Sequence, residues 1–178
     1  MTTIQGGMVC TKNSDWIQAI KDLRYHDQTP SFEDIDPRIG YSYMLSDVGA
    51  ALGIIQLKKL NSFIKRRKEI AAIYKKNLAE EITKPIAENG REHVYFKYVV
   101  RTSIKPQKVI KKIHRKKIKC ERMHFPPLHK RALIHRFNNT DSFFKTDEIV
   151  NSAVSLPIYP TLTDEEVMYI VDSLNRSI

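Results

Sequence analysis

Two short segments of the sequence carry side chains that could take part in chemistry. The first is the turn Gly40-Tyr41-Ser42-Tyr43-Met44, which directly precedes a long helical pattern. Its serine can donate a hydrogen bond to an anion, and each tyrosine combines a ring with a hydroxyl. The second is His124-Phe125-Pro126-Pro127-Leu128-His129, in which either histidine could exchange a proton near neutral pH. Tyr41 and Tyr43 could equally be core or interface residues, and isolated histidines are more often ordinary turn residues.

The cysteines give no indication of a metal site. Cys10 and Cys120 lie far apart in the sequence, and no C-x-x-C motif is present. This spacing argues against a structural zinc site and is typical of proteins from a reducing compartment. No apolar run approaches the roughly 20 residues of a membrane span, and no signal peptide is visible. We therefore expect no metal, no membrane partner and a soluble protein of the cytoplasm.

The charge of the chain raises a nucleic-acid hypothesis. With 178 residues and a formal net charge of +10, the chain could favour acidic partners. Residues 105–122 contain nine basic residues against one acidic residue, and Tyr95, Phe96 and Tyr98 could stack on bases. However, no glycine-bearing RNP pattern is present, and charge runs are mostly solvated surface. A basic module that binds nucleic acid or another partner is therefore kept as the alternative function.

The elements that must position these residues centre on a long helix predicted over residues 46–82. Ser46 is a suitable N-cap, and Asp47 places negative charge at the positive end of the helix dipole. Apolar residues follow at steps of three and four, which predicts one buried stripe that the rest of the chain covers. The stripe consists of Val48, Ala51, Leu52, Ile55, Leu60, Phe63, Ile64, Ile70, Ala71, Tyr74 and Leu78.

Shorter elements are predicted on both sides of this helix. Before it, the sequence predicts a strand at 8–10 that is buried on both faces, a helix over 13–23 and a polar connection over 24–39. After it, the patterns predict strands over 93–101 and 118–125, an irregular or partly helical stretch over 128–144 and an extended segment over 154–160. Helices are predicted from Pro106, over 147–153 and from Thr163, whose capping box ends at Glu166.

Five landmarks occur in the same order as in a known enzyme family. They are Gly6-Gly7-Met8-Val9; Gly40-Tyr41-Ser42-Tyr43-Met44-Leu45-Ser46-Asp47; Arg66-Arg67; His124-Phe125-Pro126-Pro127-Leu128-His129; and Ser155-Leu156-Pro157-Ile158-Tyr159-Pro160. In the order and the residues of these motifs, the chain resembles the C-terminal half of the pyridoxal-phosphate-dependent nucleotide-sugar aminotransferases, the DegT family. The resemblance covers nearly the whole chain.

The resemblance implies an α/β fold, namely the small C-terminal domain of a fold type I aminotransferase. A few-stranded, mainly antiparallel sheet would pack on one long helix, with shorter helices around it. Residues 1–45 would be the remnant of the large cofactor domain, and residues 46–178 would form the small domain. In the family, the lysine that forms the Schiff base with pyridoxal 5'-phosphate lies shortly before the double glycine that matches Gly6-Gly7. The first lysine here is Lys12, so we expect the cofactor domain to be missing and assign no catalytic residue.

The resemblance also implies the binding roles of three residues. Ser42 stands where the family usually has an asparagine that reaches the cofactor phosphate of the other subunit, and Tyr43 and His124 would contact substrate. Met44 replaces the family's arginine and supplies neither charge nor a forked donor, so any phosphate grip should be weaker.

The expected function is that of a fragment. The parent reaction would move an amino group from glutamate to a keto-sugar nucleotide in amino-sugar or polysaccharide synthesis. The chain alone should bind no cofactor and be inactive; it could be a truncated product, one half of a split enzyme, or a binding module that kept the fold. The partner would be a second copy, giving a homodimer, or a separate N-terminal half that carries the lysine. An exposed dimer face also predicts self-association of the isolated chain.

Overall fold

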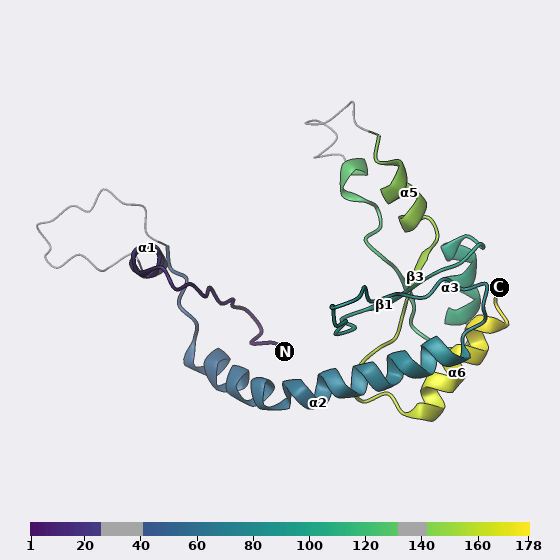
Figure 1. The fold of residues 1–178 in the computed structure, drawn as a ribbon, viewed down its shortest axis with the longest axis horizontal. Coiled ribbons are helices and arrows are strands. Elements are labelled where there is room, and N and C mark those ends of the chain that lie inside the picture. Colours follow the sequence, from purple (N-terminus) through teal and green to yellow (C-terminus); the bar gives the residue numbers. More distant parts are fainter. Residues whose placement is uncertain (26–40, 132–141) are drawn as a thin grey trace, which may run out of the picture. The chain divides into compact units, whose positions relative to one another are not determined.

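The computed structural model describes residues 1–25, 41–131 and 142–178, and the chain divides into two compact units. Unit 1 comprises Met1–Leu60 and unit 2 comprises Asn61–Ile178 (Figure 1). Most of the connection predicted over 24–39 lies outside the described residues, as do Gly40 and part of the stretch predicted over 128–144.

Unit 1 contains helix α1 (Ser14–Arg24) and the first part of α2 (Asp47–Asn77). The Asn13 side chain caps α1 by accepting from the amides of Asp15 at 2.9 Å and Trp16 at 3.1 Å. Ser46 is confirmed as a cap of α2, since its hydroxyl oxygen accepts from the Gly49 amide at 3.1 Å. Each cap satisfies first-turn amides that a helix leaves without an internal partner.

The buried strand predicted at residues 8–10 is wrong. Met8 is 85% and Val9 is 70% exposed, and the described residues of unit 1 form no strand. A strand requires a neighbouring strand to pair its backbone groups, and an apolar run alone does not supply one. Among the described residues of unit 1, only Gly49 is buried.

Unit 2 is built on a three-stranded antiparallel sheet, which confirms the predicted fold class. Its strands β1 (Tyr98–Arg101), β2 (Glu121–Arg122) and β3 (Ala153–Leu156) lie in the order β1-β3-β2. Val100 pairs with Val154 on one side of β3, and Glu121 pairs with Ser155 on the other.

The strands are shorter than predicted, because the flanking backbone leaves the extended region. Before β1, Tyr95 has a φ of 50° and its amide donates to His93 Nδ1 at 2.8 Å, which replaces a ladder hydrogen bond. β2 is bracketed by positive φ values at Lys117 and His124. A positive φ in a non-glycine residue is incompatible with a regular strand.

The remaining helices surround this sheet. They are α3 (Pro106–His114), the short 3₁₀ helix η1 (Leu128–Lys130), α5 (Phe144–Val150) and α6 (Asp164–Asn175). The predicted capping box of Thr163 and Glu166 is present at the start of α6. One hydrophobic core joins α2, β1, α3, β3 and α6, with buried residues that include Tyr74, Val100, Val109, Leu156 and Leu174.

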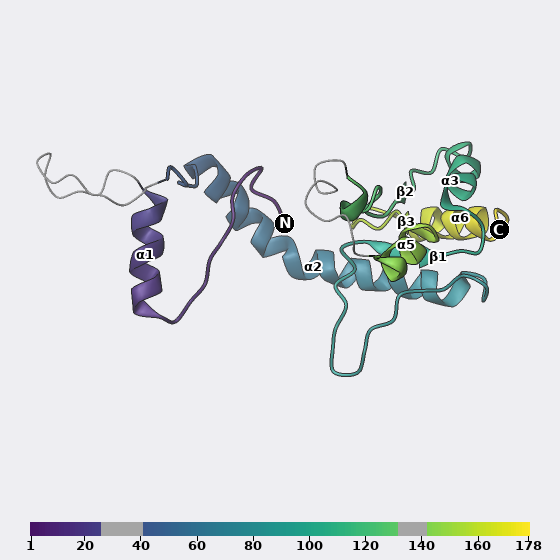
Figure 2. The ribbon, with the colours of Figure 1, turned by 90° about the horizontal axis from the view of Figure 1, so that it is seen from above.

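Helix α2 ends at Asn77, not at residue 82 as predicted. The cause is a residue of α6: the Asn175 side chain donates to the Asn77 carbonyl at 3.0 Å and accepts from the Ala79 amide at 3.0 Å. In a longer helix, the Asn77 carbonyl and the Ala79 amide would pair within α2. Here both are bonded to Asn175 of α6, which runs beside the end of α2 (Figure 2). In the parts of the chain that the model covers, no helix has the length and apolar character of a membrane span.

Candidate functional site

The segment that carries Ser42 and Tyr43 is held against the end of α1. The Tyr41 amide donates to the Leu23 carbonyl and the Tyr43 amide to the Arg24 carbonyl, both at 2.9 Å. The rings of Tyr41 and Tyr43 stack, with centroids 5.0 Å apart and planes 5° from parallel. Tyr43 is 69% exposed, so the stacked pair presents an aromatic surface to solvent.

The side chains of Ser42 and Tyr43 lie on opposite faces of this segment. Stacking of residues two apart indicates a locally extended backbone, in which successive side chains point to opposite faces. Ser42 therefore lies opposite the stacked rings. It is exposed, and its hydroxyl has no hydrogen-bond partner among the residues that the structure describes. A phosphate on one face and a substrate on the other could be contacted at the same time.

Glycines let the N-terminal segment approach the start of α2. A Cβ atom on Gly53 would lie 2.9 Å from the Thr3 Cγ2 atom, and one on Gly6 would lie 3.0 Å from the Leu45 Cδ1 atom. Gly6 also has a φ of 137°, in the region that favours glycine. Residues 3–6 thus pack beside Leu45, at the end of the segment that carries Ser42 and Tyr43.

His124 lies in unit 2, at the turn that follows β2. It has a φ of 47°, its side chain is exposed, and the next peptide bond, Phe125-Pro126, is cis. The Arg122 guanidinium lies 3.2 Å from the centroid of the Phe125 ring. It also donates to Asn151 Oδ1 at 3.2 Å and to the Val150 carbonyl at 3.4 Å. These contacts fix the turn against the end of α5, and burial lowers the pKa of Arg122.

The second histidine of this motif, His129, belongs to a small charged cluster. Its Nε2 atom lies 3.1 Å from Asp147 Oδ1, and Lys130 Nζ lies 2.7 Å from the same oxygen. The hydrogen bond from Lys130 is the main reason that the pKa of Asp147 is lowered. The cluster ties η1 to α5. Sequence reasoning did not identify Arg122 or Asp147, because their partners lie on other elements.

The residues present fit a contribution to a cofactor site. Within residues 1–25, 41–131 and 142–178, no group of three or more His, Cys, Asp or Glu residues could hold a metal ion. Ser42 offers one unpaired donor, which suits a single phosphate contact, while Met44 offers no charge. Ser42 and Tyr43 lie in unit 1, and His124 lies in unit 2.

Comparisons with known proteins agree on one family. Residues 1–175 match the model of the DegT/DnrJ/EryC1/StrS aminotransferase family. The chain is 31% identical to the uncharacterized protein MJ1066 of Methanocaldococcus jannaschii, covering 99% of this chain and 50% of that protein. It is 27% identical to GDP-perosamine synthase of Escherichia coli O157:H7, covering 99% and 48%. The chain thus spans about half the length of the curated relatives it matches.

Solved structures show the same fold over the same half. PseC of Helicobacter pylori, an aminotransferase in pseudaminic acid biosynthesis, superposes with a TM-score of 0.83 at 21% identity, covering 94% of this chain and 47% of PseC. The PLP form of Spr1654 from Streptococcus pneumoniae superposes with a TM-score of 0.79 at 22% identity, covering 94% and 44%. By the match over residues 1–175, this chain belongs to the DegT/DnrJ/EryC1/StrS aminotransferase family.

Proposed function

We propose that this chain is the C-terminal half of a pyridoxal-phosphate-dependent aminotransferase that acts on keto-sugar nucleotides. The observation that carries the proposal is the half-length match: nearly all of this chain corresponds to only 48% of GDP-perosamine synthase. The remaining half would carry the lysine that holds the cofactor, on a separate polypeptide or on a preceding segment. Without that half, the chain is inactive and holds no cofactor.

The roles proposed for the residues are those that the family resemblance implies. Pyridoxal phosphate, when bound, supplies the electron sink that lets an amino group move between glutamate and a keto-sugar. The Ser42 hydroxyl donates a hydrogen bond to the cofactor phosphate of the other subunit, across the interface between the two. Tyr43 is assigned a substrate contact on the opposite face of the same segment. His124, at the turn after β2, is assigned a substrate contact of its own. Because Met44 adds no charge, the phosphate grip rests on one hydrogen bond from this segment.

The domain boundary and the location complete the proposal. Residues 1–45 belong to the large cofactor domain, and residues 46–178 form the small domain that begins with α2. The active assembly contains two copies of the completed enzyme. The free thiols of Cys10 and Cys120 fit a reducing compartment, which supports a cytoplasmic location.

Co-expression with the missing half tests this function. The candidate partner is a polypeptide of about 180 to 200 residues, the size of a typical domain, with a cofactor lysine near its end. The mixture should show the visible absorbance of lysine-bound pyridoxal phosphate and should aminate a keto-sugar nucleotide. After borohydride reduction, mass spectrometry should find the cofactor on the partner's lysine. A colourless mixture, or a label on Lys12, would refute the proposal.

A matched pair of variants tests the role of Ser42 in the same mixture. Ser42→Ala removes a hydrogen bond to a charged group, so we expect the affinity for pyridoxal phosphate to fall about tenfold or more. Ser103→Ala makes the same chemical change at an exposed loop position of unit 2 and should leave the affinity unchanged. Equal affinities for the two variants would remove Ser42 from the phosphate site.

A further inference from the structure

An open groove of about 730 Å³ lies in unit 2 between α3 and β2. Its walls include Gln107, Ile110, Lys111, His114, Arg115 and Arg122. None of these residues is assigned to the aminotransferase reaction above. The volume falls within the range of small-molecule sites, which is about 300 to 1,000 Å³.

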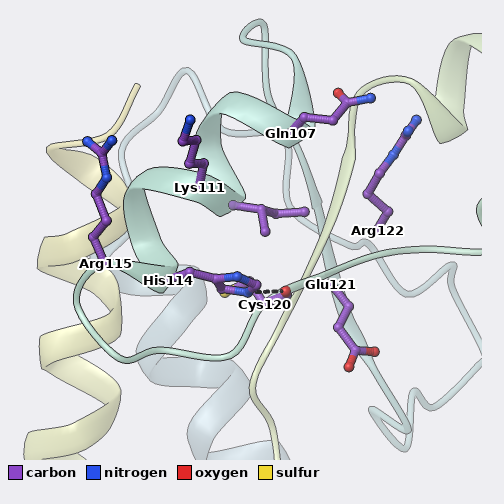
Figure 3. A pocket seen from close by; sticks show the side chains of 8 residues that line it. Gln107, Lys111, His114, Arg115, Cys120, Glu121 and Arg122 are labelled. Atoms are coloured by element: carbon purple, nitrogen blue, oxygen red, sulfur yellow. Dashed lines mark hydrogen bonds between the residues drawn. The ribbon is translucent and has the colours of Figure 1, made fainter.

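The rim of the groove carries unneutralised positive charge. The charged ends of Lys111, Arg115 and Arg122 extend to the same side, whereas the carboxylate of Glu121 extends the other way (Figure 3). Glu121 is 3.5 Å from Lys119, which does not line the groove. Neither Lys111 nor Arg115 forms an ion pair within the described part of the chain. Lys111, Arg115 and Arg122 thus place three cations along the groove, and the carboxylate of Glu121, which also lines it, extends to the other side.

The far wall is held in place by neutral partners. Arg122 donates to Asn151 Oδ1 and to the Val150 carbonyl, and its buried Nε atom has no partner among the described residues. These contacts orient the guanidinium without cancelling its charge. The His114 ring is bonded through Nε2 to the Cys120 carbonyl, at 2.8 Å. The positions of Arg122 and His114 are thus set before any ligand arrives, which lowers the cost of binding.

We propose that this groove binds a small molecule that bears a diphosphate group. Lys111, Arg115 and Arg122 would contact the anionic oxygens through charge-assisted hydrogen bonds, and half-buried Ile110 would support an organic part. A nucleic-acid strand fits less well, because no Phe, Tyr or Trp side chain is among the residues that line the groove, and single-strand sites rely on stacking rings. The inference does not depend on the aminotransferase proposal, since none of the groove residues has a role in that proposal.

Calorimetric titration of the full chain at low ionic strength tests the site, with inorganic pyrophosphate and ADP as probes. The groove variant is Lys111→Gln with Arg115→Gln, and the matched control is Lys75→Gln with Lys76→Gln on α2. All four side chains are exposed, and both variants lose the same charge. We expect the groove variant to bind both probes about 100-fold more weakly, roughly tenfold for each cation removed. The control should stay within about twofold, because exposed charges far from a ligand are screened.

The two probes also separate two sources of the same anion. Tighter binding of ADP would assign the site to a diphosphate ester, and equal binding would assign it to free diphosphate; either result supports the groove. Circular dichroism should show that both variants keep the native fold. Loss of binding in both variants alike, or no binding to the unaltered chain, would overturn the proposal. So would an oligothymidylate that binds through Lys111 and Arg115 when neither probe binds.

Discussion

Two buried tyrosines in the core of unit 2 allow a paired test of how this fold is stabilised. Tyr74 is 0% and Tyr98 is 1% exposed, and their ring centroids lie 4.9 Å apart. The Tyr74 hydroxyl donates to the Pro157 carbonyl at 2.7 Å. The Tyr98 hydroxyl is buried with no partner among the described residues. The substitutions Tyr74→Phe and Tyr98→Phe therefore remove the same atom from two different environments.

The two substitutions should change the free energy of unfolding differently. Tyr74→Phe removes a hydrogen bond and leaves the Pro157 carbonyl without that donor, so we expect a loss of about 1 to 2 kcal/mol. Tyr98→Phe removes a buried polar group that has no partner among the described residues, and such a group costs about 1 to 3 kcal/mol. The same substitution loses a small amount of packing at the position of the oxygen atom, which offsets part of this gain. We expect its stability to be unchanged or to rise by about 1 kcal/mol.

Urea unfolding of the full chain, followed by circular dichroism, measures both effects. Neither substitution should alter the slope of the unfolding free energy against urea, because the surface exposed on unfolding is nearly the same. The midpoint should fall for Tyr74→Phe and should hold or rise for Tyr98→Phe. A loss at Tyr98 as large as the loss at Tyr74 would refute the assignment of the two hydroxyls.

Three further outcomes are expected. Burial raises the pKa of the Cys120 thiol to about 12, so iodoacetamide near neutral pH should label exposed Cys10 alone, and mass spectrometry that finds both thiols labelled in the native chain would contradict this. Lys130 holds the pKa of Asp147 below its ordinary value, so the ionised Asp147 carboxylate stabilises the folded state. This contribution is present above the unfolded-state pKa, near pH 4, and is lost as the pH falls through the folded-state pKa. Asp147→Asn should flatten the fall in stability below about pH 4, and an unchanged acid limb in denaturation curves would count against the cluster. The chain expressed alone should self-associate because unit 1 leaves apolar side chains such as Met8 in solvent, and a monodisperse monomer by light scattering would argue otherwise.

The starts of α1, α2 and α6 could be predicted from the sequence because capping is local. Asn13, Ser46 and Thr163 each accept hydrogen bonds from amides at most three residues away. No other element is needed to form these contacts. The start of α3 could also be predicted, because Pro106 suits the first turn of a helix. The helix predicted over 147–153 instead spans Phe144–Val150 as α5, which has no side-chain cap.

The sequence could not predict contacts that arise between distant residues. The end of α2 depends on Asn175, which is 98 residues from Asn77. In the sequence, only the family resemblance distinguishes the Arg66-Arg67 pair from the other basic residues of the helix. In the structure, Arg67 donates to the carbonyls of Tyr95 at 3.0 Å and Ile158 at 2.6 Å, which fastens two loops of unit 2 to α2.

The candidate site divides in the same way. The residues of the family motifs indicate Ser42, Tyr43 and His124. In the structure, the stacking of Tyr41 and Tyr43 implies that Ser42 and Tyr43 lie on opposite faces of their segment. The pairs Arg122–Phe125 and His129–Asp147 were not predicted, because a charge run and a lone carboxylate give no sign of what they will contact. The strand at residues 8–10 failed because burial depends on a partner surface, which apolar character alone does not provide.

The contrast between the units bears on how a complete active site would form. Unit 2 carries its own hydrophobic core, whereas no residue of α1 is buried. An isolated helix of that length is marginal in water without tertiary packing. The segment with Ser42 is bound to the end of α1 by two backbone hydrogen bonds, so its position depends in part on that of α1. If the proposed N-terminal half covers the exposed apolar side chains of unit 1, its binding would stabilise α1 and, with it, the position of the Ser42 hydroxyl. On the proposed function, assembly of the two halves and formation of the phosphate contact are therefore one thermodynamic step.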